Sequence, residues 1–513
     1  MKKFYTTTPI YYVNAEPHIG HTYTTVAADV LARFHRMIGD KTFFLTGTDE
    51  HGAKIAEKAE EAGASPIEFT NGVAAKFQFI WRELNISNDR FIRTTEDDHK
   101  KAVQKALQFM YNKGDVYLGK YEGLYCQGCE QFKNEKDLVN GLCPDHKTKP
   151  VQMVEESYMF KMSKYADEIL KKIENDEIEI RPVEKKNEII SFYKNEGLKD
   201  VSFSRKNVKW GIPIPWDESH TVYVWADAFL NYLTGLNWDG SAGSSPEMWP
   251  VDIQLMSKDI LRIHATIWPA MLLSLGLPLL KKIFVHGFFL VDGQKMSKSI
   301  GNVISPEDLI TRYGVDAARY LLMSATSFGH DGDIGWKFFD EKYNADLANG
   351  LGNLVARSVT LYEKMQEAGI KMQNNNAELE NWEGHAFSHD VNDMWNLYQK
   401  ALKDLKIDLA LNLAREQVIG FLDSYITTTK PWALIKNKDE RAGVVMYNIL
   451  ERLRHCAFML WPFMPETAEK IWESLGLNPA EEMKKDFKEA IKWGGLPEEI
   501  TVKKGESLFP RLS

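Results

Sequence analysis

The hydrophobic pattern of the first fifty residues predicts a strand, a helix and a second strand. Residues 4–8 form a short β-prone run, and residues 42–46 form a second, more apolar one. Between them, apolar residues recur at the spacing of one helix face, at Val26, Val30, Phe34 and Ile38. Pro17 suits the first turn of this helix, and Gly39 suits its end. This order favours a parallel sheet with right-handed crossovers.

The same alternation resumes after an interruption. Residues 114–217 are rich in Tyr and Lys and show weaker helical periodicity. We therefore predict that they form a domain inserted between the two halves of one doubly wound sheet. Later in the chain, strands are predicted at residues 221–225, 252–256 and 283–290, and a helix at residues 261–275.

The last third of the chain is predicted to be a helical bundle, because no strand pattern follows residue 344. Helical patterns cover residues 347–365, 391–405, 409–428, 442–459 and 465–475, with a polar surface loop at Asn374, Asn375 and Asn376. The predicted fold class is α/β, with a doubly wound parallel Rossmann-type sheet, an inserted domain and a C-terminal all-α bundle. The predicted domain ranges are 1–113, 114–217, 218–290, 291–343 and 344–513.

Composition and charge exclude several classes of protein. The 513 residues are 44% hydrophobic and 26% charged, which suits a folded chain with a large core rather than a disordered one. A net charge of −9 excludes a uniformly basic nucleic-acid coat, although a local basic groove stays possible. The most apolar stretch, residues 270–280, is far shorter than the roughly 20 residues that span a bilayer. With no signal-like N-terminus, we expect a cytoplasmic protein without membrane contact.

Three of the four cysteines lie close together in the sequence. Cys126-Gln127-Gly128-Cys129 and Cys143-Pro144-Asp145-His146 form two hooks separated by thirteen residues. Hooks of this kind form tetrahedral zinc sites, in which four protein ligands leave no place for a reactive water. One structural zinc is therefore expected, held by Cys126, Cys129, Cys143 and His146. A pair of disulfides is the alternative, which the histidine and a reducing cytoplasm disfavour.

His18 and His21 fall where the first strand leads into the first helix. Open α/β sheets bind ligands at the carboxyl ends of their strands, and a helix N-terminus there favours phosphate. Two imidazoles three residues apart share one face and can donate to phosphate oxygens, while Gly20 leaves room for a nucleotide. Taken alone, the pair is also compatible with partly buried polar residues at a helix start, or with half of a metal site.

A second candidate phosphate site follows the last predicted strand. Lys295-Met296-Ser297-Lys298-Ser299 comes after a turn signal at Asp292-Gly293. Lysines on such a loop can neutralise a leaving pyrophosphate, because negative charge moves outward as that group departs. Taken alone, the segment is equally compatible with a solvated loop.

The two segments together resemble the paired signatures of the class I aminoacyl-tRNA synthetases, both without a deviating residue. Further segments resemble the methionyl-tRNA synthetase family over essentially the whole chain, at residues 8–14, 46–52, 223–228, 258–260 and 268–272. The resemblance implies that the catalytic residues are His18, His21, Lys295 and Lys298. It implies an ATP site of His18, Gly20, His21, Asp259, Lys295, Met296, Ser297 and Lys298, with Mg²⁺ on the phosphates.

The resemblance also implies a methionine pocket. A thioether suits a soft, apolar pocket with aromatic edges, and Asp49 would hold the α-ammonium. The other implied pocket residues are Pro9, Ile10, Tyr12, Trp225, Tyr232, Ile260, His264 and Trp268. Core aromatics are the alternative for any one of these positions. The insertion of about a hundred residues is too short for the editing domain of the isoleucine, valine and leucine relatives.

For the zinc site, the resemblance is to a single-knuckle form in which His146 replaces the more familiar cysteine. For the bundle, it implies that Asn353, Arg357 and Trp432 recognise the CAU anticodon, with Trp432 stacking on a base. The implied partners are methionine, ATP and tRNA(Met), both initiator and elongator. Residues 291–343 would carry the lysine loop and a stem-contact region, and residues 344–513 the anticodon domain. A monomer is expected, because no further dimerising domain follows the bundle.

Two other functions stay open at this point. One is a related nucleotidyltransferase that acts on a small acid without tRNA, and the helical last third argues against it. The other is a tRNA-binding protein with a dead catalytic domain, against which the intact histidine and lysine signatures argue.

Overall fold

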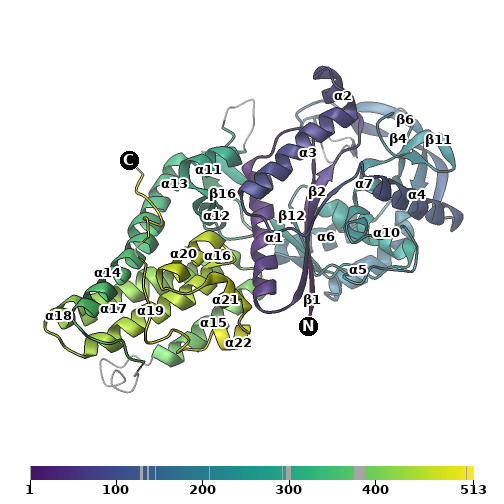
Figure 1. Cartoon of the computed structure of the whole chain (residues 1–513). Coiled ribbons are helices and arrows are strands. Elements are labelled where there is room, and N and C mark those ends of the chain that lie inside the picture. The colour runs from purple at the N-terminus through teal and green to yellow at the C-terminus, as the bar shows by residue number, and fades with distance from the viewer. Residues whose placement is uncertain are drawn as a thin grey trace.

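The computed structural model is elongated, with an α/β part at one end and a helical bundle at the other (Figure 1). The structure describes residues 2–127, 131–133, 135, 138–144, 146–206, 208–291, 293–295, 302–374, 387–503 and 505–512. Among these residues, no helix is both long enough and apolar enough to cross a lipid bilayer.

A six-stranded parallel sheet forms the centre of the α/β part. In spatial order its strands are β3 (Arg90–Arg93), β2 (Lys41–Asp49), β1 (Lys3–Tyr12), β12 (Ile253–Ser257), β13 (Lys282–His286) and β7 (Glu179–Arg181). The strand order reverses between β1 and β12, which is where open sheets of this type bind their ligands. The predicted doubly wound parallel sheet is thus confirmed.

Helices cover both faces of this sheet. Successive strand residues point to opposite faces, so Phe4 joins one hydrophobic cluster and Tyr5 the other. The first cluster includes Phe34 of α1, and the second includes Leu107 of α4 and Leu272 of α10. The helices of the α/β part are α1 (Ile19–Met37), α2 (Ala53–Glu61), α3 (Pro66–Glu83), α4 (Asp97–Asn112), α5 (Ala166–Glu174), α6 (Val183–Asn195), α7 (Val224–Ala228), α8 (Asn231–Thr234), α9 (Leu261–His264) and α10 (Ile267–Leu275), with a 3₁₀ turn at Met162–Tyr165.

Several local predictions were wrong. The predicted strand at residues 221–225 is split, because β11 (Asp217–Val222) ends at Val222 and α7 begins at Val224. Tertiary contacts here override the β-propensity of the apolar run. The predicted helix at 261–275 breaks between α9 and α10. Pro17 precedes the helix, since His18 rather than Pro17 takes the N-cap position.

The segment predicted as an insertion forms two small antiparallel sheets. One contains β5 (Gln131–Lys133), β4 (Val116–Cys126), β6 (Val151–Phe160) and β8 (Val201–Ser202), and the other contains β10 (Pro213–Ile214), β11 and β9 (Ser204–Arg205). The same segment also supplies β7, which pairs in parallel with β13 at the edge of the main sheet. A three-residue strand is too short to show a periodic pattern, so the sequence did not reveal this link.

A third small sheet and three helices lead into the bundle. They are β14 (Phe289–Val291), β15 (Gln294–Lys295), β16 (Gly332–Ile334), α11 (Pro306–Tyr313), α12 (Val315–Met323) and α13 (Trp336–Lys342). The predicted strand at 283–290 therefore spans two strands, β13 and β14, that belong to different sheets.

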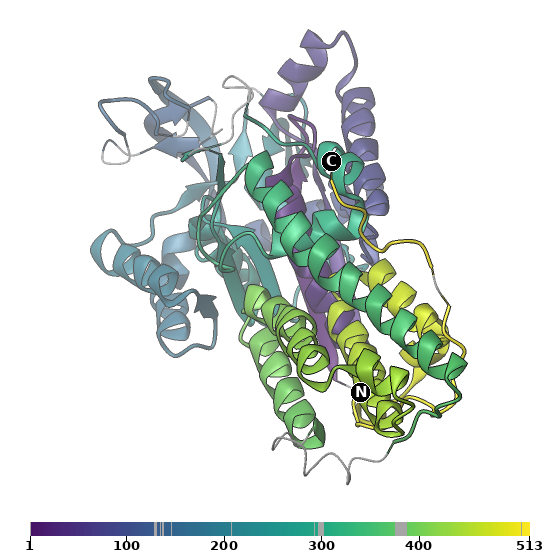
Figure 2. The same ribbon diagram turned by 90° about the vertical axis from the view of Figure 1, so that its left-hand side faces the viewer.

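The predicted helical bundle is confirmed. It contains π-helical turns at Tyr343–Gly352 and Gln417–Leu422, and the helices α14 (Asn353–Glu367), α15 (Phe387–Lys403), α16 (Ile407–Glu416), α17 (Asp423–Thr429), α18 (Pro431–Lys436), α19 (Arg441–Leu460), α20 (Pro465–Ser474), α21 (Pro479–Lys484) and α22 (Phe487–Ala490). Figure 2 shows the helices from α13 to α14 as one long rod that runs from the α/β part along the bundle. Of the predicted loop, Asn374 is exposed, whereas Asn375 and Asn376 lie outside the described residues.

Candidate active site

A cavity of about 440 Å³ lies where the carboxyl ends of β1, β2 and β12 meet. It brings together candidate residues from segments that are far apart in the sequence. The predicted residues that line it are Pro9, Ile10, Tyr12, His18, Gly20, His21, Asp49, Trp225, Tyr232, Asp259, Ile260 and His264. The sheet topology explains part of this convergence, because β1, β2 and β12 end at the same edge. Trp225 and Tyr232 come instead from α7 and α8, which follow β11 of a small antiparallel sheet.

His18 and His21 form a reciprocal cap at the start of α1. The backbone N–H of Gly20 donates to Nδ1 of His18 at 3.1 Å, and the backbone N–H of His18 donates to Nδ1 of His21 at 3.3 Å. The two rings stack with their centroids 3.8 Å apart. Because both Nδ1 atoms accept, each neutral ring carries its proton on Nε2. Each histidine can therefore donate one hydrogen bond from Nε2.

His21 stays neutral around pH 7. Burial lowers the pKa of His21 well below its usual value, and the neighbouring His18 lowers it further. A neutral ring still donates from Nε2, and the N-terminus of α1 carries the partial positive charge of the helix dipole. This end of the cavity is suited to phosphate oxygens.

Apolar and aromatic residues form the opposite end of the cavity. The Tyr232 hydroxyl lies 2.9 Å from Nε2 of His264, whose Nδ1 lies 2.9 Å from the carbonyl oxygen of Ile260. The ring of His264 therefore donates from Nδ1 and accepts from Tyr232. Burial lowers the pKa of His264 to about 4, although the hydrogen bond to Ile260 opposes this. This wall of the cavity is thus aromatic and uncharged near pH 7, as a thioether requires.

Asp49 places a carboxylate beside this wall. It ends β2, it is 6% exposed, and its carbonyl oxygen accepts from the backbone N–H of Val13 at 3.2 Å. A carboxylate in a largely buried position interacts strongly with a bound cation, since little water screens the pair. A carboxylate next to an aromatic pocket fits an amino acid with an apolar side chain.

Some predicted residues lie elsewhere or outside the described part of the chain. Trp268 is fully buried and does not line the cavity; its ring lies behind the wall, 5.7 Å from those of Tyr232 and Phe229. Lys295 lies in β15, which pairs with β14, and nothing is described of its side chain. Met296, Ser297 and Lys298 lie outside the described residues.

Sequence reasoning missed several residues that line the cavity. They are Asn14, Thr24, Lys54, Phe229, Asn231, His286 and Phe288, among others. His286 ends β13 and its Nε2 lies 2.6 Å from the Thr24 hydroxyl. The rule that ligands bind at strand ends did not identify His286, because the strand was predicted to run on to residue 290, whereas β13 ends at His286.

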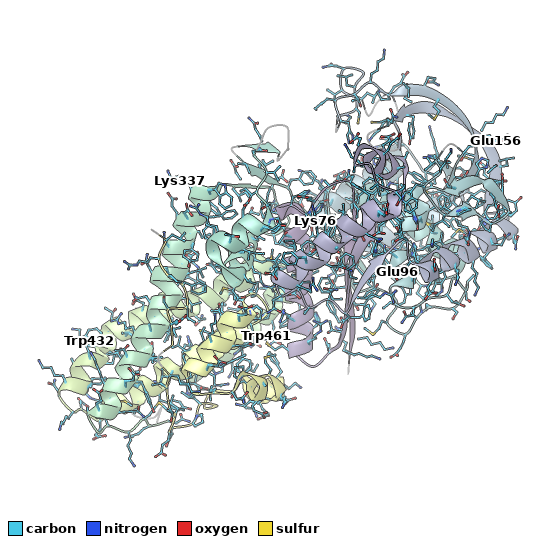
Figure 3. The ribbon with its side chains drawn as sticks, turned by 45° about the horizontal axis from the view of Figure 1, so that its top comes forward. Lys76, Glu96, Glu156, Lys337, Trp432 and Trp461 are labelled. Carbon is cyan, nitrogen blue, oxygen red and sulfur yellow. The ribbon has the colours of Figure 1, made fainter. Side chains whose placement is uncertain are left out.

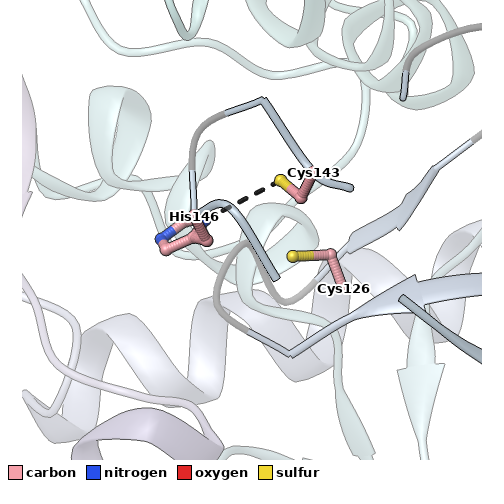
Figure 4. A group of neighbouring side chains, drawn as sticks. All are labelled: Cys126, Cys143 and His146. Atoms are coloured by element: carbon pink, nitrogen blue, oxygen red, sulfur yellow. Dashed lines mark hydrogen bonds between the residues drawn. The ribbon is translucent and has the colours of Figure 1, made fainter. Parts of the chain in front are cut away.

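A candidate metal centre lies at the end of β4. The ligand atoms of Cys126, Cys143 and His146 all lie within 4.8 Å of one another, and Cys143 Sγ is 4.0 Å from His146 Nδ1 (Figure 4). Both cysteines are buried. Two thiols and an imidazole converging on one point are a donor set that zinc prefers. Cys129, the predicted fourth ligand, lies outside the described residues. His146 also lines the active-site cavity.

Two of the three predicted anticodon residues, Arg357 and Trp432, lie against each other in the bundle. The Arg357 guanidinium lies 5.3 Å from the centre of the Trp432 ring, and its Nη1 lies 3.3 Å from a carboxylate oxygen of Asp423. Asn353 is exposed one turn earlier on α14, and Trp432 is 43% exposed. Figure 3 shows Trp432 at the end of the bundle farthest from the sheet. An exposed indole beside an arginine is a surface on which a base can stack.

Known proteins that share this architecture, a doubly wound sheet followed by a helical bundle, include the class I tRNA synthetases. A family model described as class I tRNA synthetases (M) matches residues 4–152 and 146–359. A second, described as the anticodon binding domain of methionyl tRNA ligase, matches residues 376–513. The chain belongs to the methionine–tRNA ligase family.

Individual relatives agree with this assignment. Methionine–tRNA ligase of Clostridium acetobutylicum is 45% identical over 100% of this chain and 78% of its own length. That of Streptomyces coelicolor is 41% identical over 100% of this chain and 97% of its own length. The structure of Mycobacterium tuberculosis methionyl-tRNA synthetase in complex with methionyl-adenylate has a TM-score of 0.92 at 35% identity and covers 100% of both chains.

Proposed function

We propose that the chain carries out the two-step reaction of its family. In the first step, the carboxylate of methionine attacks the α-phosphate of ATP, which gives methionyl-adenylate and releases pyrophosphate. In the second, a ribose hydroxyl of the terminal adenosine of tRNA(Met) takes the methionyl group from the adenylate, and AMP is released. The observation that carries this proposal is a single cavity with two different ends. The end at His18 and His21 suits phosphate oxygens, and the other end is apolar and has the carboxylate of Asp49 beside it.

In the first step, Asp49 holds the α-ammonium of methionine, and the wall formed by Tyr12, Trp225 and His264 surrounds the side chain. Pro9, Ile10, Tyr232 and Ile260 complete this wall, and Trp268 supports it from behind. His18 and His21 donate from Nε2 to phosphate oxygens, where negative charge develops as the bond to pyrophosphate breaks. Because the capping hydrogen bonds fix both rings beforehand, little reorganisation is needed during the reaction.

The remaining nucleotide contacts are assigned by position. Gly20 lets the nucleotide approach the start of α1, and Asp259, exposed just beyond β12, is placed for the ribose or adenine side. Lys295 and Lys298, with Met296 and Ser297 between them, neutralise the departing pyrophosphate. Mg²⁺ bound to ATP would supply further charge neutralisation at the phosphates.

Zinc has a structural role in this proposal. Cys126, Cys129, Cys143 and His146 would hold it, and a metal with four protein ligands cross-links the ends of its loop without taking part in the reaction. Since His146 also lines the cavity, the same cross-link fixes part of the active-site wall. Asn353, Arg357 and Trp432 read the anticodon at the far end of the bundle.

The test is amino-acid-dependent exchange of pyrophosphate into ATP, measured with each of the twenty amino acids and without tRNA. Exchange with methionine alone is expected. Exchange with a different amino acid would refute the pocket assignment but keep the reaction. If no amino acid supports exchange in folded, zinc-loaded protein, the proposed activity is wrong. Charging of tRNA(Met) in a second assay then separates a ligase from a nucleotidyltransferase that acts on a small acid.

A further inference from the structure

Asp227 forms a buried bridge between two histidines beneath the active-site cavity. Its Oδ2 lies 2.6 Å from Nδ1 of His51, and its Oδ1 lies 2.7 Å from Nε2 of His99. The other ring nitrogen of His99 lies 2.7 Å from the Thr234 hydroxyl. Asp227 and His99 are 1% exposed and His51 is 4% exposed. None of the four residues lines the cavity, so the bridge does not touch a ligand bound there.

The bridge joins two of the segments that carry the proposed methionine contacts. His51 lies two residues after Asp49, just beyond the end of β2. Asp227 lies on α7, two residues after Trp225. The two bridging side chains are 176 residues apart in the sequence. Any change in the Asp227–His51 contact therefore shifts the carboxylate of Asp49 relative to the indole of Trp225.

The bridge is electrostatically strong. Burial alone would raise the pKa of Asp227, but the charge and hydrogen bond of His51, followed by those of His99, hold this pKa below its usual value. A buried carboxylate that accepts two hydrogen bonds, one on each oxygen, has its orientation fixed. Each oxygen faces a different ring, so the group is a hydrogen-bonded bridge rather than a metal site.

The β2 side of the bridge is braced independently. Glu50 is fully buried and accepts from Nε and Nη2 of Arg93 at 2.7 and 2.9 Å. Its carbonyl oxygen accepts from the indole N–H of Trp210 at 2.5 Å. The turn after Asp49 is thus held on one side by Glu50, and His51 is its connection to α7. This makes Asp227 the link that sets the width of the pocket.

We propose that Asp227 is a positioning residue, which fixes the separation between Asp49 and Trp225 through His51 and His99 and thereby sets the affinity for methionine. This inference rests on the proposed function, in which Asp49 and Trp225 hold methionine. Among the described residues, the proposed ATP contacts lie at the start of α1 and after β12, on segments other than the two that the bridge joins. The bridge should therefore affect methionine and leave ATP binding unchanged.

The experiment compares KM for methionine and KM for ATP in pyrophosphate exchange. We expect Asp227→Ala to raise KM for methionine about tenfold or more, with KM for ATP within about twofold of wild type. Asp227→Asn should recover most of the loss, because an amide can accept from His51 and donate to His99 once His99 changes tautomer. His99→Gln, which alters only the outer half of the bridge, should give an intermediate increase.

The matched control is Asp40→Asn. Asp40 lies 2.7 Å from His35 Nδ1, and it precedes the same strand β2 at the opposite end. Losing this carboxylate should leave KM for methionine within about twofold of wild type, since the contact is far from the cavity.

Three results would overturn the inference. They are a folded Asp227→Ala protein with wild-type KM for methionine, an equal rise in both KM values, or a rise in the Asp40→Asn control. If Asp227→Ala does not fold, His99→Gln decides the outcome, and no rise in KM for methionine in that variant refutes the inference. Asp49→Asn separates the two proposals, because an unchanged KM for methionine in that variant contradicts the proposed function itself.

Discussion

Arg319 in α12 donates from Nη2 to Oδ2 of Asp29 in α1 at 2.7 Å, and both side chains are completely buried. The same guanidinium donates to the carbonyl oxygens of Pro462 and Phe463, at the corner between α19 and α20. Trp461, the residue before this corner, lies at the junction of the bundle and α1 (Figure 3). The helix that begins with the histidine cap is therefore tied directly to the helical bundle.

Arg319→Met should lower the free energy of unfolding by about 3–5 kcal/mol, as expected when one partner of a buried ion pair is removed. The substitution keeps the length of the side chain but leaves the carbonyl oxygens of Leu84, Pro462 and Phe463 without their donor. Urea unfolding measures the change. Arg312→Met is the control, because its partner Asp340 is partly exposed, and it should cost less than about 1 kcal/mol. Equal losses in the two variants would contradict the prediction.

Stability should fall as the pH is lowered from about 4 to about 2. Burial alone would raise the pKa of Asp29, but Arg33 and Arg319 hold this pKa at about 2. In the same way, Arg454 and His455 hold the pKa of Glu451 at about 2, although burial alone would raise it. Unfolded carboxyls titrate near pH 4. Since both folded-state pKa values are depressed, their contribution is complete above about pH 4 and is lost as pH falls through about 2.

Urea unfolding between pH 6 and pH 2.5 checks this window. In Glu451→Gln, which lacks one of the two carboxylates, the free energy of unfolding should fall less steeply across it. An identical slope in wild type and variant would show that Glu451 does not contribute.

Trp432→Ala should leave methionine activation nearly intact and lower kcat/KM for tRNA charging about ten- to a hundredfold. Base stacking on an aromatic ring contributes about 1–3 kcal/mol, and 1.4 kcal/mol corresponds to a factor of ten. Leu397→Ala, at a 56% exposed apolar residue of α15, is the control and should change neither assay. Equal losses of activation and charging in Trp432→Ala would refute the separation of the two sites.

Protein purified without chelator should contain about one zinc per chain. Cys143→Ser should lower this content to well under half and reduce the thermal midpoint, because a structural metal contributes to folding. Cys456→Ala removes a buried thiol of α19 that lies outside the cluster, and it should keep its zinc. Wild-type protein with far less than one zinc would refute the metal site, whatever its activity.

The parts of the site that could be predicted are those made of neighbouring residues. The histidine pair lies within one helix turn, and each capping hydrogen bond spans at most three residues. Cys143 and His146, three residues apart, likewise supply two of the three ligand atoms of the candidate metal centre, and Asn353 and Arg357 lie one turn apart on α14. Trp268 shows the limit of this reasoning. It lies in a segment that resembles the family, and it was predicted to line the methionine pocket, but its side chain lies behind the residues that line the cavity.

By itself, the sequence determined the β–α–β start of the chain, the all-helical last third and the position of the histidine pair at the start of α1. These features depend on hydrophobic periodicity and on hydrogen bonds between residues that are close together in the sequence, so a short stretch of sequence is enough to predict them. Only the tertiary structure decided that β7 completes the sheet, that Asp227 links β2 to α7 and that Arg319 joins α1 to the bundle. Periodicity shows which face of an element is buried but not what covers it, and these contacts join residues roughly a hundred to three hundred positions apart.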